Sequence, residues 1–124
     1  MTPATGSRRR LAVLAAVVLV VVLVVAGVAL AETFKVKAKQ GDKWGPVHTY
    51  IGKGDKVVWT NPTSKTHDLS AIGDWELSET LKPDEQAAKK FPQTGTFRYR
   101  CARHSAIVDG RCEGMCGIVH VFTG

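Results

Sequence analysis

The chain has 124 residues, and one block near its start cannot belong to a water-soluble core, because Leu11–Ala31 is a run of 21 residues without a charged or polar side chain. The 93 residues of Glu32–Gly124 suffice for one small domain and exclude a β/α barrel or a dinucleotide-binding fold. Three of the 17 Lys and Arg residues precede Glu32. The domain therefore has 14 basic and 11 acidic residues, a net charge of +3. We expect no nucleic-acid partner, because such proteins carry a denser, clustered basic excess.

The apolar run predicts a membrane-spanning helix. At about 1.5 Å per residue it can cross a hydrocarbon core of roughly 30 Å. The basic residues Arg8–Arg10 precede it, and positive charge on the cytoplasmic flank sends the following chain across the membrane. The small residues Ala29 and Ala31 also resemble a signal-peptide cleavage site, so a retained anchor and a cleaved leader both remain open.

We therefore interpret residues 1–31 as a cytoplasmic tip plus a transmembrane anchor or signal peptide, and residues 32–124 as the functional domain. Either fate of the leader places that domain outside the cytoplasm, where disulfides persist. The expected location is the cell membrane, as a single-pass protein held through residues 11–31. If the leader is cleaved, the domain is instead periplasmic or secreted.

Within the domain, short strands follow one another in chain order. Lys and apolar residues alternate in Thr33–Lys39, which predicts a half-buried strand with Phe34, Val36 and Ala38 inward. A helical turn is expected near residues 83–88. Short strands between turn signals favour an antiparallel β-sandwich. The other predicted strands cover residues 47–51, 56–61, 67–72, 96–101 and 118–122.

The chemistry-bearing side chains concentrate toward the end of the chain. Three Cys in an exported domain leave one thiol outside any disulfide, and metal ligation explains why an oxidising compartment tolerates it. Cys101 and His104 share one tight loop, His67 lies on another predicted strand, and Met115 comes just before the last strand. One thiolate, two imidazoles and a thioether are ligands suited to copper.

Three stretches together resemble the cupredoxin family, nearest the plastocyanin and amicyanin type: Val57–Asn61 followed by His67, then Gly95–His104, then Gly114–Val121. The resemblance covers roughly residues 34–122. It implies an all-β, cupredoxin-like Greek-key β-sandwich of eight strands, here preceded by one hydrophobic N-terminal helix. It also implies one type 1 copper ion held by His67, Cys101, His104 and Met115, with His104 as the more exposed electron port.

The chain departs from the family pattern between His104 and Met115. Ten residues, Ser105–Gly114, intervene where the family usually has only a few. Cys112 and Cys116 bracket Met115, and we interpret them as a disulfide that ties the base of a lengthened loop and holds Met115 near the copper.

A different set of residues supports a competing interpretation. Cys112, Cys116 and His120 have the spacing of the binuclear copper A centre of terminal oxidases, which is also a cupredoxin. That assignment leaves Cys101 and His104 unexplained. It also needs His120, which alternation places on the outward face of the last strand. We expect His120, and likewise His48, to be surface residues.

The function expected from these residues is single-electron transfer between redox partner proteins on the outer face of a membrane, with copper cycling between Cu(I) and Cu(II). We see no Ser-His-Asp order, paired carboxylate motif or Gly-rich phosphate loop. We therefore expect no small-molecule substrate and expect that the protein is not an enzyme. Copper capture or delivery by the same ligands, and a metal-free interaction module, are the alternative functions.

Overall fold

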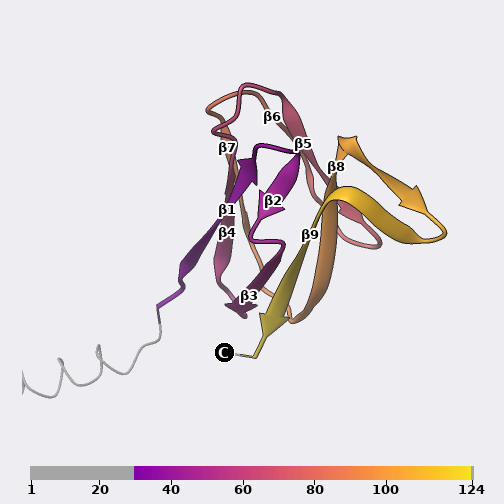
Figure 1. Ribbon diagram of the computed structural model, residues 1–124. Coiled ribbons are helices and arrows are strands. Elements are labelled where there is room, and N and C mark those ends of the chain that lie inside the picture. The colour runs from indigo at the N-terminus through magenta and orange to yellow at the C-terminus, as the bar shows by residue number, and fades with distance from the viewer. Residues whose placement is uncertain (1–29, 124) are drawn as a thin grey trace, which may run out of the picture. The chain divides into compact units, whose positions relative to one another are not determined.

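The computed structural model describes residues 30–123, which form nine β-strands in two sheets (Figure 1). This confirms the predicted all-β class. No helix within residues 30–123 is long and apolar enough to cross a membrane. The predicted N-terminal helix and membrane segment fall almost wholly outside these residues and stay predictions.

One sheet has four strands in the order β2-β1-β4-β7, and the other has five in the order β3-β9-β8-β5-β6. Strands that follow one another along the chain often belong to different sheets, as expected of a Greek-key sandwich. The four-stranded sheet contains β1 (Thr33–Lys39), β2 (Lys43–Gly45), β4 (Lys56–Thr60) and β7 (Gln86–Lys90). The five-stranded sheet contains β3 (His48–Gly52), β5 (His67–Ile72), β6 (Ser78–Leu81), β8 (Gly95–Val108) and β9 (Arg111–Phe122).

Three details of the predicted sandwich are wrong. Residues 30–123 form nine strands where the resemblance implied eight. The pairing is not purely antiparallel, because β1 pairs with β4 and β3 pairs with β9 in parallel. Side chains alternate in the same way in both kinds of pair, so the sequence pattern does not reveal strand direction. The helical turn expected near residues 83–88 is also absent there, since β7 pairs along β4 with Ala88 opposite Val58.

The core lies between the two sheets, where the alternation predicted it. Val36, Val57 and Trp59 face inward from the four-stranded sheet and are fully buried. Trp59 meets the ring of Tyr99, from β8, edge to face at 5.3 Å between ring centroids. Such aromatic pairs add about 0.5–1.5 kcal/mol to the stabilisation from buried area. The core therefore fixes the two sheets against each other and supports both ends of the sandwich.

The chain enters the sandwich at one end, and the predicted ligands lie at the other. At the entry end, the backbone N–H of Glu32 donates to the carboxylate of Asp55 at 2.9 Å, and Lys53 N–H donates to the carbonyl of Phe122 at 2.7 Å. From there β1 and β4 run side by side toward the turn that precedes His67. At about 3.3 Å per residue, β1 carries the chain roughly 20 Å from one end to the other.

Gly117 of β9 lies close against the side chain of Tyr99 of β8. The two residues are directly opposite in the pairing, and a Cβ atom at position 117 would overlap the ring and hydroxyl of Tyr99. Because Tyr99 is fully buried, it cannot move aside freely. We predict that Gly117→Ala lowers the free energy of unfolding by about 1–3 kcal/mol, measured by urea denaturation.

The control is the same substitution in a Tyr99→Leu background. The shorter leucine leaves room for the added methyl group, so the second substitution should cost less there than in the parent protein. An equal cost in both backgrounds would contradict the proposed overlap.

Candidate metal centre

An irregularity in the β8–β9 pair creates the centre. The register shifts between Arg100 and Ser105 of β8. The four residues Cys101–His104 therefore lie opposite the single residue Met115 of β9. Extra residues in one strand form a bulge that redirects side chains. Here the bulge carries both predicted ligands of β8.

The ten residues between His104 and Met115 are not a loop but the continuation of β8 and β9 as a hairpin (Figure 1). Ser105–Val108 pairs with Arg111–Gly114. The connecting residues Asp109 and Gly110 have φ angles of 51° and 76°, as a tight hairpin turn requires. The outgoing and returning strands of the hairpin are equally long, so Met115 returns to a position opposite the bulge. A longer or shorter hairpin with equal strands would place Met115 in the same position.

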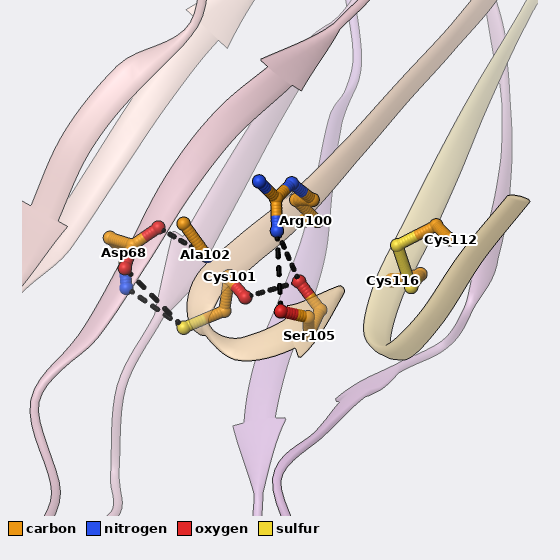
Figure 2. Close-up of a disulfide and its surroundings, with 7 residues drawn as sticks. All are labelled: Asp68, Arg100, Cys101, Ala102, Ser105, Cys112 and Cys116. Atoms are coloured by element: carbon orange, nitrogen blue, oxygen red, sulfur yellow. Dashed lines mark hydrogen bonds between the residues drawn. A yellow bond between two sulfur atoms is a disulfide. The ribbon is translucent and has the colours of Figure 1, made fainter. Parts of the chain in front are cut away.

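Gly114 allows the hairpin to lie against the bulge. Its φ angle is +103°, and a Cβ atom there would overlap the carbonyl oxygen of His104. Both the conformation and the close approach therefore favour glycine. On the other strand, Arg100 donates to the hydroxyl of Ser105 at 3.1 Å across the bulge (Figure 2). These contacts hold the bulge in one shape.

Three of the four predicted ligands converge in space. His67 and His104 bring their Nδ1 atoms to 3.1 Å, and Cys101 Sγ lies 3.4 Å from Nδ1 of His104 and 3.9 Å from Nδ1 of His67. The circumcentre of a triangle with these edges is about 2.0 Å from each atom, and N and S ligands bind a first-row metal ion at about 2.0–2.3 Å. The donor atoms thus stand at the spacing that one bound metal ion requires.

Hydrogen bonds from the preceding turn determine the tautomer of His67. Asn61 is buried, and its side-chain oxygen accepts the hydroxyl proton of Thr63 at 2.6 Å. The hydroxyl of Thr63, having given its proton to Asn61, accepts from Nε2–H of His67 at 3.1 Å. With the proton on Nε2, the lone pair of Nδ1 is free to bind a metal ion.

Burial sets the charge states at the centre. His67 and Cys101 are fully buried, whereas His104 is half-buried. Burial, assisted by the neighbouring His104, lowers the pKa of His67. Burial raises the pKa of the Cys101 thiol, against a hydrogen bond from the backbone of Asp68. The lowered pKa of His67 favours its neutral, metal-binding form, and a metal ion that enters the centre displaces the proton of the Cys101 thiol.

Asp68 ties β5 to the bulge and was missed by the sequence analysis. Its backbone N–H donates to Cys101 Sγ at 3.3 Å, and its carboxylate accepts the N–H of Ala102 at 2.7 Å (Figure 2). The carboxylate also accepts the N–H of Arg103 at 3.2 Å. The available signal was its position directly after the predicted ligand His67. Nothing in the sequence pairs it with residues more than 30 positions away.

The disulfide predicted between Cys112 and Cys116 is confirmed, with a Cα–Cα distance of 6.2 Å. It bridges β9 across Met115, and Cys101 remains as a buried free thiol. In Figure 2 the sulfur of Cys101 points toward Asp68 and away from the disulfide. The two bonded sulfurs are not available as bridging thiolates, so the structure argues against the binuclear alternative.

The remaining predicted residues lie as follows. Met115, the predicted fourth ligand, is fully buried and lies opposite the bulge in the strand pairing. His120, the third member of the binuclear alternative, lies on the exposed face of β9, with its Nε2 atom 3.0 Å from Nδ1 of His48. The predicted surface placement of these two histidines therefore agrees with the structure.

Solved structures with the same architecture are cupredoxins or contain a domain of this kind. A purple cupredoxin from Nitrosopumilus maritimus is 18% identical with a TM-score of 0.60, over 72% of this chain and 99% of that chain. A reduced amicyanin variant is 22% identical with a TM-score of 0.61, over 78% of this chain and 88% of that chain. No family model and no curated protein sequence matches the chain. The chain therefore has the cupredoxin fold, as the resemblance implied.

A third solved structure corrects the expectation that the protein is not an enzyme. A Cu-containing nitrite reductase from Thermus scotoductus SA-01 matches 78% of this chain with a TM-score of 0.62 and 20% identity, and the match covers 23% of that chain. A domain with this fold can thus form part of an enzyme. The fold and the lack of hydrolase motifs do not exclude a part in catalysis.

The hydroxyl of Thr63 offers a test of the tautomer argument. We predict that Thr63→Val lowers the affinity for copper by about tenfold, because His67 loses the acceptor that keeps its proton on Nε2. Thr63→Ser is the matched control and should retain the parent affinity. Competition titration with a copper chelator measures both, and equal affinities for the two variants would contradict this role.

Proposed function

We propose that this domain contains a type 1 copper centre and transfers single electrons. His67, Cys101 and His104 hold the ion, with Met115 as the fourth ligand. The observation that supports this most is the convergence of Nδ1, Nδ1 and Sγ at the spacing of a single bound ion. When bound, copper supplies a centre that accepts and returns one electron without a proton.

The donor chemistry supports copper as the ion. The soft Cys101 sulfur suits Cu(I), and the imidazoles of His67 and His104 accept both oxidation states. The fold neighbours point the same way, since they include Cu(I) forms of amicyanin variants and a Cu-containing nitrite reductase.

The protein contributes a rigid setting for electron transfer. The bulge is held by hydrogen bonds from Ser105 to Cys101 and from Arg100 to Ser105, and His67 is held through Thr63. Ligands held this firmly move little when the charge of the ion changes, which keeps the barrier to electron transfer low. His104, the half-buried ligand, is the one through which we propose electrons enter and leave.

We also propose that the domain works outside the cytoplasm and is tethered through residues 11–31. The chain joins the sandwich at Glu32, and the metal centre lies at the opposite end. A tether attached at Glu32 leaves that opposite end free to meet redox partner proteins. Added protease tests this location, because it should digest the domain while the cytoplasmic membrane is still intact. Digestion only after that membrane has been permeabilised would overturn the proposed location.

Replacement of the buried thiol tests the copper centre. We predict that the copper-loaded protein has an intense visible thiolate-to-Cu(II) absorption and that Cys101→Ser abolishes it. The Cys112→Ser/Cys116→Ser double variant is the matched control and should keep the absorption. Loss of the band in the double variant together with its survival in Cys101→Ser would contradict the mononuclear centre.

Repeated redox cycling in the presence of a Cu(I) chelator separates electron transfer from copper delivery. An electron carrier should retain its copper over many cycles, because the ligands are preorganised in the folded protein. Transfer of the copper to the chelator within the first cycles would instead identify a delivery protein.

A further inference from the structure

We propose that Asp68 lowers the reduction potential of the metal centre by holding a fixed negative charge beside the Cys101 sulfur. This inference rests on the proposed electron-transfer function. It attributes the preference of the metal ion for one oxidation state to a residue that is not a ligand. It concerns the direction in which electrons flow, because a lower potential makes the centre a better electron donor.

The carboxylate of Asp68 lies close to the sulfur and is held there. Its Oδ2 atom is 3.7 Å from Cys101 Sγ. Oδ1 accepts from Ala102 N–H at 2.7 Å and from the Ser70 hydroxyl at 3.1 Å, while Oδ2 accepts from Arg103 N–H at 3.2 Å. Donors on both β5 and the bulge thus orient the carboxylate, so its charge stays in one place relative to the centre.

The charges around Asp68 offset only part of its effect. Arg103 approaches Oδ2 with its Nε atom at 3.5 Å, but the side chain of Arg103 is 56% exposed and that of Asp68 only 14%. Water and salt screen the exposed guanidinium more than the buried carboxylate. On the other side of the centre, Asp42 and Lys65 form their own ion pair at 3.2 Å and largely offset each other.

The sign of the effect follows from charge accounting. A thiolate with Cu(II) carries one net positive charge, and the same thiolate with Cu(I) carries none. A nearby negative charge therefore stabilises the oxidised state more than the reduced state. Reduction transfers one electron from a partner to the centre, with no bond made or broken and no proton moved, so the carboxylate acts only through its field.

The test is the reduction potential of the copper-loaded full chain. We predict that Asp68→Asn decreases the preference for Cu(II) over Cu(I) by at least tenfold, which raises the potential by about 59 mV for one electron. Asp68→Glu keeps the charge and should remain near the parent value. Glu113→Gln, on the exposed hairpin, removes the same charge away from the sulfur and should leave the potential unchanged.

Arg103→Gln provides an independent variant in which Asp68 itself is intact. Removal of the partly compensating cation should lower the potential, opposite to the effect of Asp68→Asn. If Asp68→Asn does not retain copper, this variant decides the question, and a potential equal to that of the parent overturns the proposal.

The visible absorption and electron spin resonance spectra separate this inference from the function on which it rests. Absence of the thiolate-to-Cu(II) band in the parent protein defeats the proposed function. A parent-like band in Asp68→Asn together with an unchanged potential defeats only the role of Asp68. Equal shifts in Asp68→Asn and Glu113→Gln also overturn it, because the position of the charge would then be irrelevant.

Discussion

The structure of the metal centre depends on one local mismatch, in which four residues of β8 lie opposite one residue of β9. A regular strand would alternate Cys101, Ala102, Arg103 and His104 between the two faces of the sheet. The bulge breaks that alternation, so Cys101 and His104 both reach the Nδ1 atom of His67. The long hairpin that follows the bulge does not displace Met115. Its two strands are equally long, so the chain returns to the position opposite the bulge.

Hydrogen bonds fix the donor atoms before any metal ion arrives. The turn at Asn61 and Thr63 sets the tautomer of His67, and Asp68 fastens the bulge to β5. The same carboxylate that positions the bulge also lies beside the ligand sulfur. In the role that we propose for Asp68, one residue combines structural support with electrostatic tuning, and this would link the stability of the bulge to the oxidation state that the centre prefers.

Much of this arrangement was predictable from local patterns. Alternation in Thr33–Lys39 located β1 and its buried face, and the odd number of cysteines singled out one thiol for a metal. The spacing of Cys101 and His104, with His67 on another strand, named the three residues that converge. The prediction that the protein is not an enzyme was wrong to rest on ligands and fold, because a domain with this fold is also part of a Cu-containing nitrite reductase. The membrane segment at residues 11–31 stays a prediction.

The sequence by itself determined the all-β class, the inward faces of the strands and the identity of the donor residues, because these follow from residue chemistry and from a period of two along the chain. The tertiary structure alone decided that β1 and β4 run parallel, that Ser105–Gly114 is a hairpin and that Asp68 meets Cys101. The physical reason is that alternation carries no information about strand direction or register. Hydrogen bonds between residues more than 30 positions apart exist only once the sheets have packed.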